Sequence, residues 1–253
     1  MNLQNTLLKA SLFCLFSLFT LQVSAHNLWI ETAPTANIGE HHRVSIYMGE
    51  YSYGVRENIK EHRKEIGPIT LYLIEPDGTV AELETTIDGN RFVARFTPKT
   101  KGTYRLALNV TKAPVVDWRE YDLGILKTNF FSSAVVEVAA PKDHKTSMNP
   151  VSDLNELLIT PTTTAPFERN TPVTFQLTFQ GKPLPEQEIK VGYKDKWFKT
   201  LYTDEQGQLT VSFPWNGQFV IETVHTEQTS GSFQGEEYEA IRHTATYVIP
   251  RQK

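Results

Sequence analysis

The sequence predicts an all-β protein made of two tandem antiparallel β-sandwiches, immunoglobulin-like or transthyretin-like, with little helix. From Trp29 onward, apolar and polar residues alternate with a period of two, which is the pattern of strands with one buried face. Turn residues interrupt the alternation about every eight to twelve positions, a spacing typical of sandwiches and barrels. The main exception is the charged stretch 51–65, where we expect an exposed loop with a helical turn.

The first half has the clearest strand patterns, at Phe92–Phe96 and Tyr104–Val110. Short segments rich in Gly, Asp and Asn separate the strands of this region, and such residues favour tight turns. We therefore expect a meander of consecutive strands from about Leu71 to Val110. A further apolar run predicts a closing strand at Ala134–Val138.

Two polar, proline-bounded stretches at 141–150 and 160–166 flank a short apolar patch. A shift of composition of this kind is typical of a domain boundary. We therefore divide the chain into a signal peptide at 1–25, an N-terminal β-sandwich domain at 26–140, a linker at 141–166 and a C-terminal β-sandwich domain at 167–253.

Residues 1–25 have the pattern of a secretory signal peptide. Lys9 precedes an apolar run, and small residues lead up to Ala25, as signal peptidase requires. The run is too short to span a bilayer comfortably. We expect cleavage before His26, a periplasmic or secreted protein, and no membrane span after cleavage. Cys14, the single cysteine, leaves with the peptide.

The charge and motif content narrows the range of functions. The net charge is −4 with both signs interspersed and no basic block, which argues against binding to nucleic acid or anionic lipid. G-x-S-x-G, H-E-x-x-H and glycine-rich phosphate loops do not occur, so the common hydrolase, zinc-protease and nucleotide motifs are missing. A mature chain without cysteine also excludes a thiol nucleophile.

His26 is the residue that most directly suggests chemistry. Once it is the first residue, its α-amine and ring Nδ1 can form a six-membered chelate with a metal ion, and a second imidazole completes three nitrogen donors. Such sites suit divalent copper and nickel.

His225 and His243 are the candidates for that second imidazole. One ends a predicted strand and the other begins the last one. If these strands pair as a hairpin, the two rings lie close together. We predict a metal site of His26, His225 and His243. A purely structural, cross-strand hydrogen-bonding role for the two late histidines is equally open.

The remaining histidines are weaker candidates. Charged and turn-rich neighbours predict that His62 and His144 are solvated surface residues. His41 and His42 precede a strand, in which adjacent side chains face opposite sides. At most one of this pair can therefore point at a given site.

The second half has a distinctive order of strands and turns. Its turns contain G-K-P-L, T-D-x-x-G and P-x-x-G, at 181–184, 203–207 and 214–217, and a long strand follows at 218–225. This order resembles the transthyretin-like or carboxypeptidase-regulatory-like modules of extracellular proteins. Because the turn glycines have a backbone role, the resemblance implies a fold and no catalysis.

Short motifs at both ends carry a wider resemblance. The start A-H-N-L-W at 25–29, the Gly-Glu pairs at 39–40 and 49–50, and R-H-T-A-T at 242–246 resemble the NikM-like periplasmic family of unknown function. That family is linked by name to nickel or cobalt uptake. The resemblance implies a secreted pair of β-sandwiches with a metal role, and the chain has none of the multiple spans of a permease.

These observations favour a secreted periplasmic binding protein for a divalent transition metal, nickel, cobalt or copper, as an accessory to uptake or handling. The metal ion is the expected ligand, a membrane transport component the expected partner, and catalysis is not expected. Two alternatives stay open. One is a copper-dependent oxidative enzyme with an N-terminal histidine site. The other is a module that binds glycan or protein through Trp118 and Tyr121.

Overall fold

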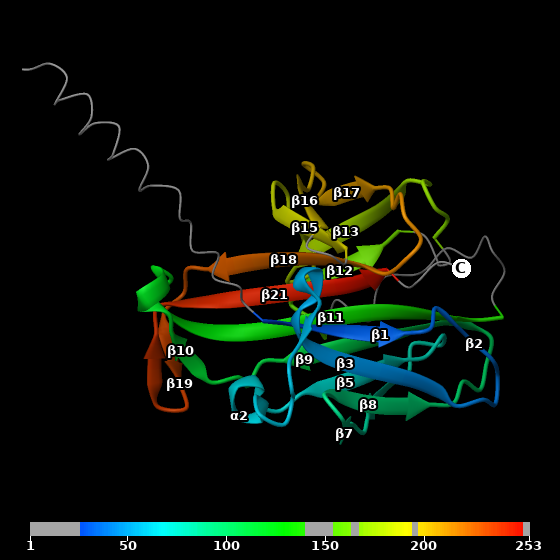
Figure 1. The fold of residues 1–253 in the computed structure, drawn as a ribbon, viewed down its shortest axis with the longest axis horizontal. Helices are drawn as coiled ribbons and strands as arrows, with labels where there is room; N and C mark the ends of the chain where they lie inside the picture. The colour runs from blue at the N-terminus through cyan, green and yellow to red at the C-terminus, as the bar shows by residue number, and fades with distance from the viewer. Residues whose placement is uncertain (1–25, 140–153, 163–166, 194–196, 250–253) are drawn as a thin grey trace, which may run out of the picture.

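The computed structural model describes residues 26–139, 154–162, 167–193 and 197–249. These residues form a five-stranded, a ten-stranded and a four-stranded sheet with a two-stranded hairpin (Figure 1), which confirms the all-β prediction. The helical segments are α2 (Arg63–Ile66) and the 3-10 turns η1 (Tyr51–Tyr53) and η2 (Arg119–Tyr121). Among the described residues, no helix has the length and apolar character needed to cross a membrane.

The five-stranded sheet, here called the front sheet, is built around the first long strand of the chain. Its order is β1 (Asn27–Thr32), β3 (His42–Glu50), β8 (Arg91–Phe96) and β7 (Thr86–Asp88), and β4 (Val55–Arg56) pairs with β3. All of these pairings are antiparallel.

The ten-stranded central sheet runs through both halves of the molecule. Its order is β16 (Trp197–Tyr202), β15 (Glu188–Tyr193), β18 (Phe219–Glu227), β21 (Ala240–Ile249), β11 (Ile125–Val138), β9 (Gly102–Val110), β5 (Thr70–Ile74) and β6 (Val80–Leu83). β10 (Val115–Asp117) and β2 (Thr35–Ala36) pair with β11. The second half of β11 pairs antiparallel with β9, and its first half pairs parallel with β21. One strand thus joins the two halves.

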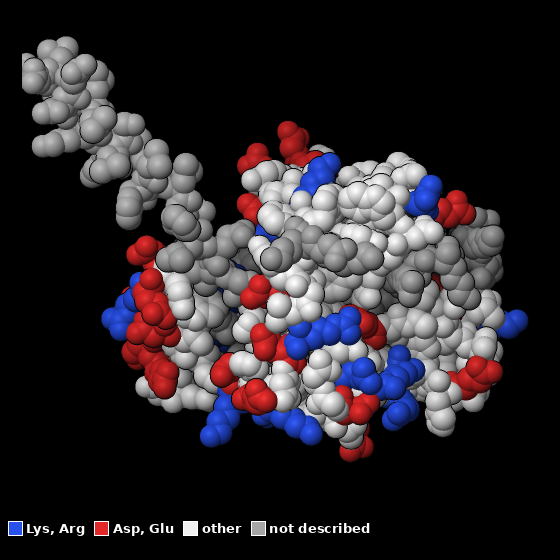
Figure 2. Space-filling model, viewed as in Figure 1, with Lys and Arg blue, Asp and Glu red and all other residues white. Residues whose placement is uncertain are grey.

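The four-stranded sheet completes the second half. It contains β12 (Leu157–Pro161), β13 (Val173–Phe179), β14 (Lys182–Pro183) and β17 (Gln208–Val211), with β13 pairing to the other three. A separate hairpin of β19 (Gly231–Phe233) and β20 (Glu236–Tyr238) lies at one end of the molecule, where a group of acidic side chains gathers (Figure 2).

Two hydrophobic cores lie on opposite faces of the central sheet. In β11, Ala134 and Val136 belong to the core shared with the front sheet, and Phe130 packs against it, whereas Phe131 belongs to the core shared with the four-stranded sheet. Successive side chains of a strand point to opposite faces. Because of this alternation, β11 contributes side chains to the cores of both sandwiches.

Several strand predictions need correction. The expected meander at 71–110 is divided between two sheets, because β7 and β8 belong to the front sheet while β5, β6 and β9 belong to the central one. The strand predicted at 134–138 begins at Ile125. The domain division stays a prediction. Strand β12, which lies within the stretch predicted as a linker, pairs with β13.

Strand β1 is fastened across the central sheet by buried hydrogen bonds. The Thr246 hydroxyl donates to the Leu28 carbonyl at 2.7 Å, and the Ile30 amide donates to the Ser132 hydroxyl at 3.1 Å. Trp29 lies in a small apolar cluster with Val220 and Val248 of the second half. These contacts hold His26, the residue before β1, at a defined place on the face of the central sheet that carries the front sheet.

Candidate metal centre

His26 faces a carboxylate that also faces a second imidazole. Its Nε2 lies 3.3 Å from Glu57 Oε1 and 3.9 Å from Glu50 Oε1. His62 Nε2 lies 3.6 Å from Glu57 Oε2, and the rings of His26 and His62 are 5.8 Å apart between centroids. The side chains of this His26 cluster are partly exposed, between 20% and 34%. Glu57 therefore stands between two histidines.

A tight return of the chain after β3 brings Glu57 to His26. β1 pairs with β3 with Asn27 opposite Gly49, so Glu50 comes beside His26. β4 then folds back onto β3 with Arg56 opposite Gly49, and the Glu57 amide donates to the Met48 carbonyl at 2.9 Å. Gly49 has φ +142°, and a Cβ there would lie 2.3 Å from the Val55 carbonyl oxygen. Only glycine fits this close, left-handed position without strain.

His62 is placed by the turn that leads into α2. Its amide donates to the Asn58 carbonyl at 3.3 Å, and its Nδ1 is hydrogen-bonded to Glu65 Oε2 at 2.7 Å. That hydrogen bond is the main reason why the pKa of His62 is raised. With Nδ1 so occupied, Nε2 is the ring nitrogen directed at Glu57.

The surroundings of the His26 cluster are acidic. Within the described residues, the ion-pair contacts of Glu50, Glu57 and Glu65 are with His26 and His62 alone. Behind them burial raises the pKa of Glu222, an effect that a hydrogen bond from Asn27 partly offsets. Among the described residues, Glu50, Glu57 and Glu65 thus have no ion pair with a lysine or arginine, which favours a cation, whereas Lys190 and Arg242 act on Glu222.

His225 and His243 form a second cluster. They lie directly opposite each other in the antiparallel pair of β18 and β21, as predicted, with ring centroids 6.5 Å apart. His243 is completely buried, and neither of its ring nitrogens has a hydrogen-bond partner. Nε2 lies 3.4 Å from Glu227 Oε2 and Nδ1 lies 3.7 Å from Glu156 Oε2. Burial lowers the pKa of His243 to about 4.

The central sheet separates the two clusters. Thr246 contacts β1 on one face of β21, and His243, three residues earlier, points to the other face. The His26 side chain contacts Glu50, Glu57 and His62. The structure thus brings together two of the three predicted ligands and pairs the third with His62, which the sequence predicts to be a solvated surface residue. His144 lies outside the described residues.

Neither cluster is closed around an ion. In the part of the chain that the structure describes, no group of three or more His, Cys, Asp or Glu side chains is placed so that it could hold a metal ion as it stands. Any metal site at either cluster therefore requires small side-chain movements.

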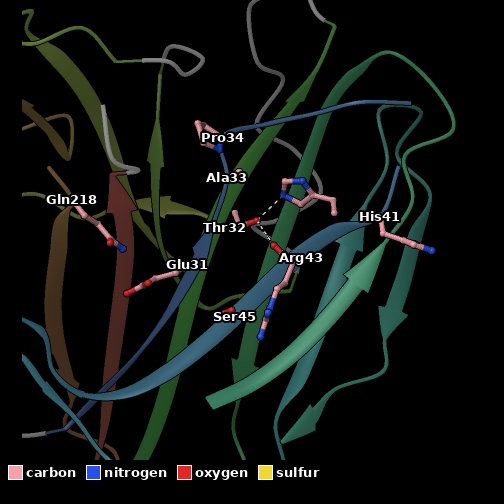
Figure 3. Close-up of a pocket in the computed structure, with 9 residues that line it drawn as sticks. Glu31, Thr32, Ala33, Pro34, His41, Arg43, Ser45 and Gln218 are labelled. Atoms are coloured by element: carbon pink, nitrogen blue, oxygen red, sulfur yellow. Dashed lines mark hydrogen bonds between the residues drawn. The ribbon is translucent and has the colours of Figure 1, made fainter. Parts of the chain in front are cut away.

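His41 is exposed and His42 is buried, yet both line the same hollow, although the alternation predicts that at most one of them points at a given site. His42 is buried and shares a 2.7 Å hydrogen bond with Thr32, and burial lowers its pKa. His41 contacts Thr97 at 2.9 Å. Both line a hollow of about 620 Å³ between the front sheet and Gln218 (Figure 3). The Arg43 guanidinium in this hollow is paired with Asp88 at 2.7 Å.

Comparison with known families assigns the chain to a family of unknown function. A family model described as a domain of unknown function, DUF4198, matches residues 23–227. The chain belongs to this family. The DUF4198 range contains the His26 cluster and His225, and it ends before His243. No curated protein matches the chain in sequence.

Two solved structures have a distant likeness to the chain. A DUF4785 family protein from Legionella pneumophila has 11% identity and a TM-score of 0.32, with 79% of this chain and 52% of that one covered. A mutant of Salmonella alpha-2-macroglobulin has 11% identity and a TM-score of 0.29, with 88% of this chain and 14% of that one covered. The DUF4198 chain thus spans about half of the first and a seventh of the second. Both TM-scores are too low to indicate a shared fold.

Proposed function

We propose that this DUF4198 protein, after removal of its signal peptide, binds a divalent transition metal ion through His26, His62 and Glu57. Its role is that of a periplasmic or secreted accessory to metal uptake or handling, with a membrane transport component as the partner. The observation that carries the proposal is one carboxylate between two imidazoles, with its two oxygens 3.3 Å and 3.6 Å from their Nε2 atoms.

These distances are close to those between neighbouring ligands of one ion. Metal–nitrogen and metal–oxygen bonds of about 2.0–2.2 Å place tetrahedral neighbours about 3.3–3.5 Å apart. By the same geometry two imidazoles on one ion have ring centres about 5 Å apart, against 5.8 Å in the structure. The rings must therefore approach by about an ångström, measured between their centres, before both Nε2 atoms can reach one ion, and the partial exposure of the side chains allows this movement. Imidazole and carboxylate donors together suit nickel, cobalt, zinc and copper.

The orientation of the His26 ring favours Nε2 as its ligand atom. The chelate expected from the sequence uses Nδ1 with the α-amine instead. Because Nε2 and the α-amine lie at opposite ends of one residue, they cannot both bind a single ion. A site built on Nε2 depends on the fold of the loop that carries Glu57 and His62, and it does not need a free amine.

Partial exposure supports a carrier. An ion at the His26 cluster is held by flexible side chains at the surface, so it can be taken up from solution and passed on without opening a buried cavity. Glu50, 3.9 Å from His26 Nε2, offers a further oxygen during exchange.

A titration with Ni²⁺ tests the proposal. Processed protein purified from a periplasm is titrated by calorimetry beside His26→Ala, His62→Ala and Glu57→Gln. We expect each variant to lose one equivalent of bound Ni²⁺ or to bind it at least tenfold more weakly. His41→Ala, an exposed histidine of the same sandwich, is the matched control and keeps wild-type binding. Wild-type binding by His62→Ala would refute the proposal.

One added variant identifies the donor atom. A protein with one extra residue before His26 has no amine on His26, yet the fold around it is unchanged. The Nε2 site predicts affinity within a few-fold of the processed protein. A much larger loss in that variant would assign the metal to the amine and Nδ1 instead.

A further inference from the structure

The buried ring of His243 lies in an unfavourable electrostatic environment. Both of its nitrogens lack a hydrogen bond, and both face a carboxylate, Glu227 at 3.4 Å and Glu156 at 3.7 Å. A neutral imidazole has one N–H and one lone pair. Whichever tautomer is present, one lone pair of the buried ring therefore points at a carboxylate, and the carboxylates are themselves partly exposed, 32% for Glu227 and 44% for Glu156. A cation between that nitrogen and its carboxylate turns the repulsion into two bonds.

The side of Nε2 offers the donors for such a cation. His225 and Glu227 are two residues apart on β18, so their side chains point to the same face of the sheet. His243 lies directly opposite His225 on β21. Three donors are thus gathered on one face of a regular hairpin. His225 Nδ1 is 3.3 Å from the Gln187 side-chain oxygen, an acceptor, which leaves His225 Nε2 with its lone pair.

The side of Nδ1 offers an orienting carboxylate. Glu156 Oε2 is positioned to accept the Nδ1–H of His243 when Nε2 binds a metal ion. A metal-bound histidine generally donates its second ring N–H to a carboxylate, carbonyl or water, and this partner fixes its tautomer and raises its basicity. In this arrangement Glu156 orients the His243 ring through Nδ1, and Nε2 and Glu227 bind the cation on the other side of the ring.

We propose that His225, Glu227 and His243 form a second divalent-metal site, independent of the His26 cluster, with Glu156 as the positioning residue for His243. The 3.4 Å between His243 Nε2 and Glu227 equals the separation of about 3.3–3.5 Å between neighbouring tetrahedral ligands. The 6.5 Å between ring centroids must shorten toward about 5 Å. His225 and Glu227 are only partly buried and can move, while His243 is held by Phe131 and Phe179.

The test uses the mature chain with the first site disabled. Zn²⁺ is titrated against a chelating indicator in His62→Ala, then in His62→Ala combined with Glu227→Gln or with Glu156→Gln. We expect one Zn²⁺ per chain in His62→Ala, at least tenfold weaker binding with Glu227→Gln, and a 10- to 100-fold loss with Glu156→Gln. Glu237→Gln on the exposed β20 hairpin strand is the control, and it changes nothing.

The design separates this site from the proposed function. If His26 and His62 bind no metal, His62→Ala has the stoichiometry of the wild type and still loses Zn²⁺ on Glu227→Gln. Co²⁺ gives a second readout, because its visible absorption reports nitrogen and oxygen ligands and must change with Glu227→Gln. Absence of bound Zn²⁺ in folded His62→Ala, or equal affinity with and without Glu227, would overturn the proposal.

Discussion

Replacement of Gly49 by alanine is expected to damage the His26 cluster without touching any of its side chains. The new Cβ would lie 2.3 Å from the Val55 carbonyl oxygen, and ordinary contact begins at 3.4 Å, so β4 must retreat by about an ångström. The residue would also keep a left-handed φ of +142°, at a cost of about 1–3 kcal/mol. When the cost of displacing the β4 backbone is added to this strain, we expect a loss of about 2–4 kcal/mol in the free energy of unfolding.

The same retreat moves Glu57, because its amide is bonded to the Met48 carbonyl beside Gly49. A ligand displaced by about an ångström no longer meets bond lengths that vary by only ~0.2 Å. We therefore expect at least tenfold weaker Ni²⁺ binding, measured by calorimetry on protein whose folding is verified by urea denaturation.

Gly54→Ala is the matched control. Gly54 lies in the same loop with φ +71°, but a Cβ there meets no atom within 4 Å. It should cost only the strain of a left-handed residue, about 1–2 kcal/mol, and leave Ni²⁺ affinity unchanged. If Gly49→Ala binds Ni²⁺ as tightly as Gly54→Ala does, the return of β4 does not position a ligand and the reasoning is wrong.

Three further predictions concern stability. Burial lowers the pKa of His243 in the folded protein from its ordinary 6.5 to about 4. Between these two pH values the unfolded chain binds more protons than the folded protein, so the stability present above pH 6.5 falls by up to about 3 kcal/mol toward pH 4. Glu156, whose pKa is raised by burial, acts in the opposite direction, and Glu227, His225 and Lys127 also act on this ring. Urea denaturation of metal-free protein in EDTA should therefore show a steeper pH dependence for the wild type than for His243→Gln, and equal slopes would contradict the assignment. Thr246→Val should cost about 1–3 kcal/mol, since it leaves the buried Leu28 carbonyl unpaired, as denaturant midpoints would show. Phe131→Ala should cost about 3–5 kcal/mol through the cavity it leaves in the second core, and a loss below 1 kcal/mol by calorimetry would exclude that packing role.

Local patterns in the sequence were sufficient to predict the all-β class and much of the strand content. The alternation at 92–96 and 104–110 corresponds to β8 and β9. The hairpin that pairs His225 with His243 was also predictable, because both residues border strands that are consecutive apart from the short β19–β20 hairpin.

The allocation of strands to sheets was not predictable in the same way. β8 and β9 have similar alternation and a short connection, yet β8 pairs with β3 and β9 pairs with β5 and β11. Alternation says which side chains of a strand are buried, and it does not say which neighbour buries them. The extent of β11 was missed for a related reason, since the consecutive apolar residues Phe130 and Phe131 pack against cores on opposite faces and interrupt the simple pattern.

The sequence did not predict which residues contact His26, because these contacts depend on the chain folding back after β3, and no local pattern predicts that fold. Glu57 and His62 lie in a charged stretch whose composition indicates a solvated surface. Their place beside His26 is set by Gly49, β4 and the turn at Asn58. The useful signal was the Gly49-Glu50 pair, since a glycine at the end of a long strand indicates a close backbone approach.

The shared strand β11 leads to a last prediction about cooperativity. Composition predicts a linker at 141–166 and hence two halves that proteolysis would separate, but β11 supplies side chains to both cores and pairs with both β9 and β21. Unfolding of either half exposes one face and one edge of that strand, which destabilises the other half. We therefore expect a single unfolding transition, with the amides of β8 in the first half and of β13 in the second reporting the same denaturant midpoint by hydrogen exchange. Two separated midpoints would show that the pairing of β11 with β21 contributes little, and that the halves fold as independent domains.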